Sequence, residues 1–254
     1  MSQDFRNIDR FNLRADNYDK YRPSYPQALL DFMYKYNSLN EKSVVVELGA
    51  GTGILTQELA KWPCKIIAIE PNNEMREKAS EALNKHRNCT IKNTTAEHTG
   101  LADNSADMIV CAQSFHWFNI TEAKREFKRI LRNGGKAAII WNIRSARTPF
   151  EKAYEHFIRN FSIDYAEVKK RESRGNNLTE FFKGQSLEEY LFSYDTHLSF
   201  KQLLGRTLSY SYMPNEDHES VIPMKAALKA LFDRYADTGI ISLSYQTKLF
   251  LGTM

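Results

Sequence analysis

A short apolar run followed at once by three closely spaced glycines constrains the fold of this chain more than any other feature. The run is Val44–Leu48, and Gly49, Gly51 and Gly53 come directly after it. Three consecutive β-branched residues favour a buried strand, and the apolar residues beyond the glycines have the spacing of an amphipathic helix. We therefore expect a strand, a tight turn and a helix start whose unpaired N–H groups face a closely bound ligand.

The spacing of the glycines distinguishes between two classes of nucleoside cofactor. A dinucleotide-binding turn has the pattern G-x-G-x-x-G/A, whereas this chain has G-x-G-x-G, with Ile54 where the dinucleotide pattern needs a small residue. Glu47 stands two residues before the first glycine, where its carboxylate repels a diphosphate and attracts a cationic group. These residues favour a cationic cofactor. A glycine turn that serves only the fold is the alternative interpretation.

The sequence Glu-Leu-Gly-Ala-Gly-Thr-Gly at residues 47–53 resembles the first motif of the class I S-adenosylmethionine-dependent methyltransferases. The resemblance implies that S-adenosyl-L-methionine is the cofactor and S-adenosyl-L-homocysteine its product. It also implies that the residues of this motif hold the cofactor, namely Glu47, Gly49, Ala50, Gly51, Thr52 and Gly53.

A second apolar run, Ile66–Ile69, ends in Glu70. A carboxylate at this strand end can accept hydrogen bonds from both ribose hydroxyls, in dinucleotide and methyltransferase folds alike. An exposed acid at a strand end is the alternative. In the methyltransferase pattern the residues that follow lie along the adenine, and in this chain they are Pro71, Asn72 and Met75.

A third match to the family lies in Asn93–His98. This stretch resembles the segment in which an acidic side chain and a backbone amide meet the adenine amino group. Ala96 and Glu97 match the pattern and are expected to contact the cofactor. Thr94 and Thr95 replace the usual Gly-Asp pair, so the resemblance implies nothing for them.

The fourth apolar run is followed by a segment rich in aromatic residues. Gln113 is expected beside the methionine part of the cofactor. Phe115, His116 and Trp117 are expected at the acceptor, because π faces suit a sulfonium and exclude water from the methyl group. His116 is also the candidate general base. Packing in the core or against a cap is the alternative for these side chains.

The N-terminal pattern Tyr-x-x-x-Arg-Pro-x-Tyr-Pro starts at Tyr18. It resembles the segment before the first strand in small-molecule methyltransferases of the type 11 group, which includes trans-aconitate-type and quinone-type enzymes. The resemblance implies that Tyr18 and Arg22 fold over the cofactor, with Arg22 on its carboxylate in a bidentate contact. A packed N-terminal arm is the alternative.

Apolar runs alternate with helical patterns through the first 145 residues, which predicts an α/β fold with a doubly wound, Rossmann-like, mostly parallel sheet. Near the C-terminus, Ile241–Leu251 alternates between apolar and polar residues, as is typical of an antiparallel strand. Together with the resemblance, this predicts a seven-stranded sheet with an antiparallel C-terminal strand, plus a helical cap. We expect one structural unit in six parts: an N-terminal arm or lid (1–40), a cofactor-binding core (41–145), a first cap segment (146–184), a core strand (185–198), a second cap segment (199–239) and a final core strand (240–254).

The composition and charge of the chain limit the classes of partner that it can bind. A net charge of +4 without a dense Lys/Arg block makes nucleic acid an unlikely partner. No stretch reaches the roughly 18 apolar residues of a membrane span. Cys64, Cys89 and Cys111 lie far apart and lack the spacing of metal ligands, so we expect no metal site and a reducing, cytoplasmic location.

The sequence therefore predicts transfer of a methyl group to a small-molecule acceptor by in-line displacement. No Asn/Asp-Pro-Pro-Tyr stretch follows the fourth apolar run, which argues against methylation of adenine or glutamine nitrogens. The alternatives are an RNA or protein methyltransferase, an NAD-type oxidoreductase and a non-catalytic cofactor-binding protein. The acceptor, the methylated atom and the oligomeric state stay open.

Overall fold

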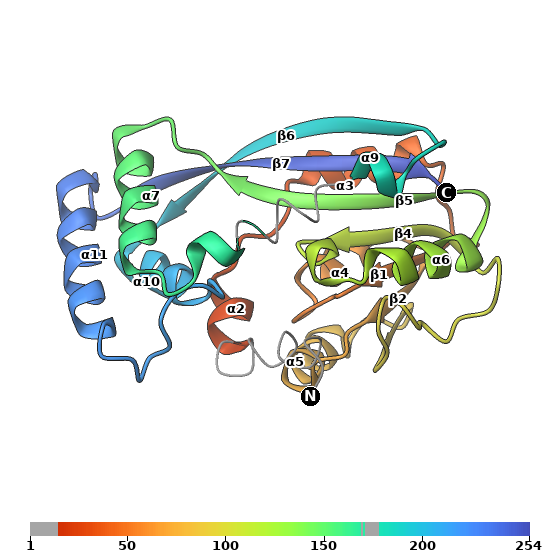
Figure 1. Cartoon of the computed structure of the whole chain (residues 1–254), viewed down its shortest axis with the longest axis horizontal. Helices are drawn as coiled ribbons and strands as arrows, with labels where there is room; N and C mark the ends of the chain where they lie inside the picture. Colours follow the sequence, from red (N-terminus) through yellow and green to blue (C-terminus); the bar gives the residue numbers. More distant parts are fainter. Residues whose placement is uncertain (1–14, 169, 171–177) are drawn as a thin grey trace.

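The computed structural model describes residues 15–168, 170 and 178–254, and its centre is a seven-stranded sheet (Figure 1). The strands are β1 (Val44–Leu48), β2 (Lys65–Ile69), β3 (Cys89–Lys92), β4 (Ala106–Ala112), β5 (Leu131–Arg144), β6 (Leu187–Leu198) and β7 (Ile241–Thr253). Their order across the sheet is β3-β2-β1-β4-β5-β7-β6. Strands β1 to β5 pair in parallel, and β7 runs antiparallel to both β5 and β6. The expected fold is confirmed, with the antiparallel strand lying inside the sheet rather than at its edge.

Helices cover both faces of the sheet. They are α2 (Ala15–Tyr21), α3 (Gln27–Tyr36), α4 (Ile54–Leu59), α5 (Asn73–Leu83), α6 (Ile120–Ile130), α7 (Pro149–Phe161), α9 (Leu178–Phe181), α10 (Phe200–Leu208) and α11 (Val221–Tyr235), with a 3₁₀ turn, η2, at Phe115–Trp117. Side chains alternate along a strand, so Val46 and Leu48 pack with α6 and α9, whereas Val45 packs with α3 and α4. Burial on both faces explains the continuous apolar runs of the sequence.

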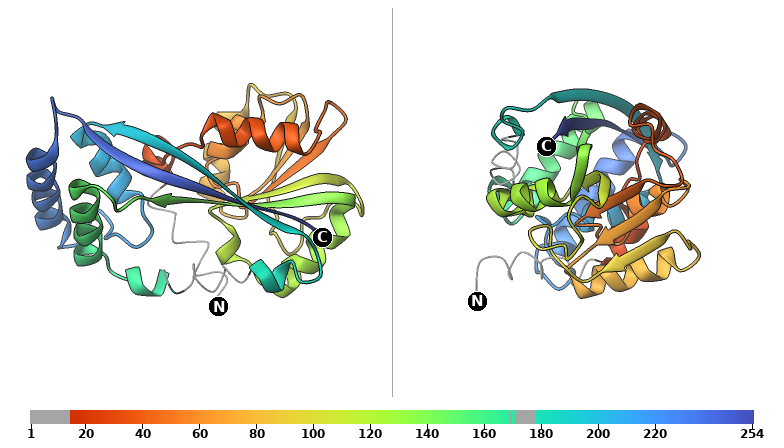
Figure 2. Two further views of the ribbon diagram at one scale, coloured as in Figure 1. Left: turned by 90° about the horizontal axis from the view of Figure 1, so that it is seen from above. Right: turned by 90° about the vertical axis from the view of Figure 1, so that its right-hand side faces the viewer.

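The last three strands are much longer than the others and carry the cap. Strands β5, β6 and β7 have 14, 12 and 13 residues, against five in β1. They extend from the core to the helices α7, α10 and α11 (Figures 1 and 2). There the strand ends contribute Leu198, Ile241 and Leu243 to an apolar cluster separate from both clusters of the core. Residues 1–14 of the expected arm and 171–177 of the expected first cap segment lie outside the described residues.

The N-terminal helix α2 is attached to the cap rather than to the sheet. A side chain on Gly205 of α10 would stand 2.2 Å from the Tyr21 ring, so the two helices approach closely because this residue is glycine. Arg206 donates to the Tyr21 carbonyl (2.8 Å), and Arg22 donates to the Ser209 carbonyl (3.0 Å). None of the helices in the described ranges has both the length and the apolar character that crossing a bilayer requires.

Candidate functional site

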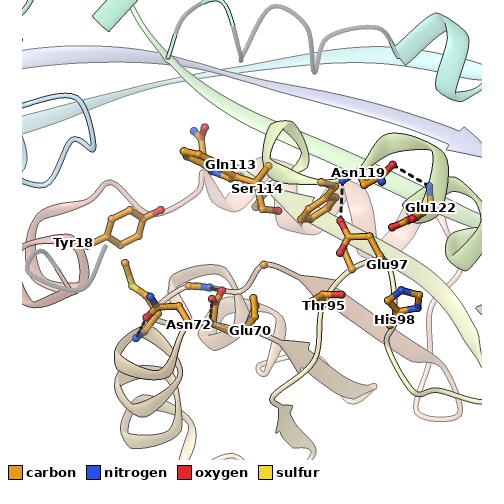
Figure 3. Close-up of a pocket in the computed structure, with 18 residues that line it drawn as sticks. Tyr18, Glu70, Asn72, Thr95, Glu97, His98, Gln113, Ser114, Asn119 and Glu122 are labelled. Carbon is orange, nitrogen blue, oxygen red and sulfur yellow. Dashed lines mark hydrogen bonds between the residues drawn. The ribbon is translucent and has the colours of Figure 1, made fainter. Parts of the chain in front are cut away.

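A cavity of about 380 Å³, here called the core cavity, lies at the carboxyl ends of β1, β2 and β4 (Figure 3). Open α/β sheets bind their ligands at this edge. Eleven of the residues singled out in the sequence line it: Tyr18, Gly49, Gly51, Glu70, Pro71, Asn72, Met75, Ala96, Glu97, Gln113 and Trp117. They come from five segments that are distant in sequence, and the strand order brings four of these to one sheet edge.

The glycine turn forms its hydrogen bonds within the protein. The N–H groups of Gly49 and Ala50 both donate to the Ile69 carbonyl (2.9 and 3.0 Å), and that of Gly51 donates to Oε2 of Glu70 (2.8 Å). The unpaired N–H groups expected from the sequence belong to the start of helix α4 at Ile54, and these three residues precede it. The N–H groups of these three residues are engaged because the end of β2 lies directly beside the turn, and the turn offers a shaped surface rather than a set of free donors.

Two glycines of the turn have different functions in the structure. Both have left-handed backbone conformations, with φ of +69° at Gly49 and +59° at Gly51. A Cβ on Gly49 would stand 2.5 Å from that of Ser114, whose hydroxyl donates to the Leu48 carbonyl (2.6 Å). A Cβ on Gly51 would find its nearest neighbour, the Tyr18 ring, at 3.9 Å. Gly49 is thus needed for packing of the fold, whereas space is available at Gly51 on the cavity side.

Glu70 presents a carboxylate held on both of its oxygens. Oε2 accepts from Gly51 N and Oε1 from Asn72 N, each at 2.8 Å, and the side chain is 7% exposed. Burial raises the pKa of Glu70, while these backbone N–H groups oppose the rise. A carboxylate oxygen has two lone pairs, so each oxygen can still accept one hydroxyl from a ligand in the core cavity.

Glu47 lies deeper, beneath the glycine turn. Its side chain is 1% exposed, and Oε2 accepts from the Thr56 hydroxyl (2.6 Å). Burial raises the pKa of Glu47 to about 8. Glu47 lines a small recess of about 30 Å³ together with Arg22, Ala50 and Gly49. The recess therefore brings a carboxyl group and a guanidinium to one place beside the core cavity.

The far wall of the core cavity contains residues that the sequence did not single out. Asn119 N donates to Oε1 of Glu97 (2.9 Å), and Oδ1 of Asn119 accepts from Glu122 N (3.4 Å; Figure 3). Further lining residues that were missed are Thr95, His98, Ala112 and Ser114. Their proximity in sequence to Glu97 and Gln113 was the available signal. Asn119 caps the next helix, α6, and Glu122 lies in its first turn, and neither gave such a signal.

A second cavity of about 870 Å³, here called the cap cavity, lies between the core and the cap helices. Its core side includes His116 and Trp141, and its cap side includes Tyr210 and Tyr212. Tyr18, Gln113 and Trp117 line both cavities, which makes the two neighbours. A ligand in one cavity can therefore reach a ligand in the other across these three side chains.

Gln113 stands at this junction in a strained conformation. Its φ is +59°, a left-handed value that non-glycine residues adopt rarely. Its N–H donates to the Ile140 carbonyl (2.9 Å), and its Nε2 donates to the Asn142 carbonyl (3.2 Å). Such strain persists where the surroundings fix the residue, and it is concentrated at functional sites. Strand β5 is what holds Gln113 between the two cavities.

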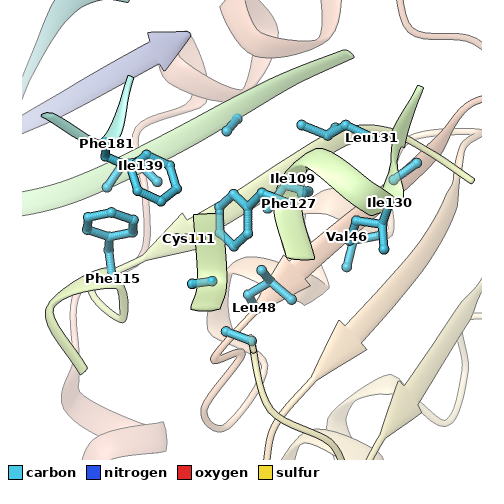
Figure 4. Packing of buried hydrophobic residues seen from close by; sticks show 14 of the residues in the cluster. Val46, Leu48, Ile109, Cys111, Phe115, Phe127, Ile130, Leu131, Ile139 and Phe181 are labelled. Carbon is cyan, nitrogen blue, oxygen red and sulfur yellow. The ribbon is translucent and has the colours of Figure 1, made fainter. Parts of the chain in front are cut away.

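Three residues singled out in the sequence line none of the three cavities described here. Thr52 is fully buried, and Gly53 begins helix α4 against Ala79. Phe115 is 1% exposed and packs edge-on against Phe181, with ring centroids 4.8 Å apart (Figure 4). The expectation that Phe115 contacts the acceptor is corrected by this placement. A 3₁₀ turn distributes successive side chains around its axis, so Phe115 enters the core while His116 and Trp117 reach the cavities.

Comparison with known proteins gives a consistent result. A family model described as a methyltransferase domain matches residues 46–139. An uncharacterized methyltransferase of Anoxybacillus flavithermus is 30% identical over 183 residues, covering 68% of this chain and 83% of that protein. An uncharacterized methyltransferase-like protein of Schizosaccharomyces pombe is 29% identical over 250 residues, covering 96% and 94%. Several other curated methyltransferases are matched over only about half of their own length.

A solved structure agrees at the level of the fold. A putative type II methyltransferase from Anaeromyxobacter dehalogenans superposes with a TM-score of 0.67 at 19% identity, covering 91% of this chain and 97% of that one. The likeness includes the cap as well as the sheet, since nearly the whole of both chains is aligned.

Proposed function

Because the chain belongs to the class I S-adenosylmethionine-dependent methyltransferases of the type 11 group, we propose that it methylates a small molecule bound in the cap cavity. The bound cofactor supplies a methyl group on a sulfonium, which an acceptor takes by in-line displacement. The observation that carries the proposal is the junction: Gln113 and Trp117 line both cavities, so cofactor and acceptor can be aligned across them.

The core cavity has side chains that suit each part of this cofactor. We assign the ribose hydroxyls to the two oxygens of Glu70, and the cationic and anionic ends of the amino-acid tail to Glu47 and Arg22. The adenine lies along Pro71, Asn72 and Met75 and reaches Ala96 and Glu97. Two observations support these assignments: carboxylates line the core cavity, and the small recess holds both a carboxyl group and a guanidinium.

The same geometry opposes a dinucleotide. A diphosphate needs free N–H donors or cations, but the N–H groups of Gly49, Ala50 and Gly51 are bonded within the protein. Among the described residues that line the core cavity, none is a lysine or an arginine, and three are glutamates. An NAD-type oxidoreductase is therefore the weaker interpretation.

The size of the cap cavity supports a small acceptor. Pockets for small molecules commonly span about 300–1,000 Å³, and the cap cavity, at about 870 Å³, lies within this range. We assign His116 to accept the proton that a hydroxyl or amine acceptor must lose. A carboxylate acceptor has no such proton and needs no base.

The experiment separates the classes of acceptor. Purified protein is incubated with S-adenosylmethionine carrying a labelled methyl group and with three fractions of a cell extract: small molecules, RNA and protein. We expect label in the small-molecule fraction. Label confined to RNA or protein would refute the proposal, and no transfer to any fraction despite cofactor binding would favour a non-catalytic cofactor-binding protein. Titration with S-adenosylhomocysteine and with NADH in the same preparation checks the cofactor.

We also propose a reducing, cytoplasmic location. Cys64, Cys89 and Cys111 all carry free thiols, and two of them are buried. Free thiols persist in reducing compartments, which supports this location.

A further inference from the structure

The cap cavity carries an excess of positive charge. The described residues that line it include Arg22, Arg144, Arg159 and Lys248 as cations and only two carboxylates. Lys248 is paired with Glu189 (2.9 Å). At the other end Glu155 accepts from both Arg144 (2.9 Å) and Arg159 (3.3 Å), while no described carboxylate pairs with Arg22. The described lining therefore has two more cations than carboxylates. With the carboxylate of the cofactor on Arg22, as proposed above, one uncompensated positive charge remains, where Arg144 and Arg159 share Glu155.

Arg144 is the guanidinium best placed to meet a ligand. It ends strand β5, and its side chain is 12% exposed. Nη1 donates to the Tyr212 hydroxyl (2.8 Å) and Nη2 to Glu155 (2.9 Å). Among the described residues these bonds use two of its five N–H donors. Arg144 also stands two positions along β5 from Asn142, whose carbonyl holds Gln113. It is therefore close to the junction of the two cavities.

Tyr210 reports the strength of this positive field. Its ring lies against two guanidiniums, those of Arg22 and Arg144, each 4.7 Å from the ring centroid. Burial raises the pKa of Tyr210, but the guanidiniums of Arg144 and Arg22, a hydrogen bond with Tyr245 and the guanidinium of Arg206 together lower it to about 8. A phenol buried this deeply keeps a lowered pKa where nearby positive charge and hydrogen bonding outweigh desolvation, and the two largest contributions here come from Arg144 and Arg22.

Excess charge that is partly removed from water is unfavourable unless a counter-ion is bound. The side chain of Arg144 is 12% exposed, whereas that of Arg159 is 63% exposed, so the unfavourable charge is that of Arg144. Among the described residues that line the cap cavity, Glu155 and Glu189 are the only carboxylates. The walls nearer the core are aromatic, with Trp117, Trp141 and Phe250. Lys248 lies beside Trp141 and Phe250, but its charge is balanced by Glu189. The cavity thus combines an aromatic end without net charge with a cationic end, as a site for an amphiphilic anion does.

We propose that the methyl acceptor carries a carboxylate, and that Arg144 determines this specificity by binding it while the aromatic residues hold the acceptor's apolar body. A guanidinium matches the planar fork of a carboxylate. The inference rests on the proposed function and narrows it to one class of acceptor.

The test is a titration of protein saturated with S-adenosylhomocysteine. The probes are benzoate, cinnamate and 3-phenylpropionate, each compared with its neutral amide by calorimetry. We expect at least one carboxylate to bind at least tenfold more tightly than its amide. In Arg144→Gln we expect this preference to fall below threefold. In Arg144→Lys, which keeps the charge but loses the planar fork, we expect a preference between those two values.

The matched control is Arg125→Gln, which removes the same charge from an exposed position on α6 that lines neither cavity. We expect it to keep the full preference. Should Arg144→Gln fail to fold, the double variant Arg144→Gln/Glu155→Gln is tested in its place, because it removes both partners of the ion pair. No preference for any carboxylate in the wild-type protein, or an equal loss in the control, would overturn the inference. Failure of the wild-type protein to bind S-adenosylhomocysteine would instead overturn the proposed function.

Discussion

The core cavity and the cap cavity adjoin each other and have opposite charge. The core cavity is lined by Glu70, Glu97 and Glu122, with no lysine or arginine among its described residues. The cap cavity has more arginines and lysines than carboxylates. Complementary charge favours the correct ligand and disfavours the wrong one. We propose a cationic methyl donor in the core cavity and an anionic acceptor in the cap cavity. Each of the two would therefore bind more weakly in the cavity of the other.

The largest expected effect tests the shape of the core cavity. In Gly51→Val the side chain enters the space beside the Tyr18 ring, where nothing stands closer than 3.9 Å. We expect affinity for S-adenosylhomocysteine to fall about a thousandfold or more, about 4 kcal/mol, while the protein stays folded. Calorimetry and circular dichroism measure the two properties.

The matched control for Gly51→Val is Gly239→Val, a left-handed glycine with open space around it and remote from both cavities. It carries the same backbone strain and should keep normal affinity. Equal affinity in the two variants would show that the turn does not form the wall of the cofactor site.

The next effect tests the carboxyl group beneath the turn. The pKa of Glu47 is raised in the fold from 4.5 to about 8. The contribution of the Glu47 carboxyl group to the stability of the fold is thus greatest below pH 4.5. It is lost as the pH rises toward 8, because only the unfolded chain ionises in that range. We expect Glu47→Gln to gain stability over the wild type as the pH rises. The difference in the free energy of unfolding between the variant and the wild type should be about 3 kcal/mol larger at pH 7 than at pH 4.5, without cofactor. Urea denaturation at both pH values measures this difference.

A cationic ligand should ionise the same group. We expect binding of S-adenosylhomocysteine at pH 7 to release a proton from the wild-type protein, because its ammonium favours the carboxylate form of Glu47. Calorimetry in two buffers of different ionisation enthalpy detects that proton, and Glu47→Gln should release none. Equal proton release in both proteins would place the ammonium elsewhere.

A smaller effect tests the core side of the cap cavity. In His116→Ala we expect kcat to fall about a hundredfold for a hydroxyl or amine acceptor, the scale of general base catalysis. Affinity for the cofactor should change little, because His116 lines only the cap cavity. The exposed His218, changed to alanine, serves as the control. An unchanged kcat would leave His116 with a structural function.

The smallest effect tests the ribose contact. Glu70→Gln keeps the shape of the side chain but replaces one acceptor oxygen with a donor. We expect affinity for S-adenosylhomocysteine to fall about tenfold, the scale of one hydrogen bond to a charged group. Glu74→Gln, on the exposed side of α5, removes the same charge and should have no effect. Loss of affinity in both variants would indicate a general effect of charge rather than a contact.

The two cavities also differ in how far the sequence predicted them. The glycine turn, Glu70 and Gln113 follow directly from strand ends, and parallel strands in a doubly wound sheet bring such ends to one edge. The sequence therefore indicated most of the core cavity before its geometry was known. Phe115 was placed wrongly, because a single 3₁₀ turn decides which side of the segment each aromatic faces. That choice depends on the packing of Phe181 from a helix far along the chain.

By itself, the sequence determined the type of sheet, its antiparallel strand and the residues at the edge of the core. These depend on local periodicity and on spacing within short segments. Only the tertiary structure decided the cap cavity, where Arg22, Arg144 and Tyr210 meet from a helix end, a strand end and a loop. No local pattern encodes that meeting, because it depends on the register of three long strands and on the contact of α2 with α10. The excess of positive charge becomes visible only when these distant residues line one cavity.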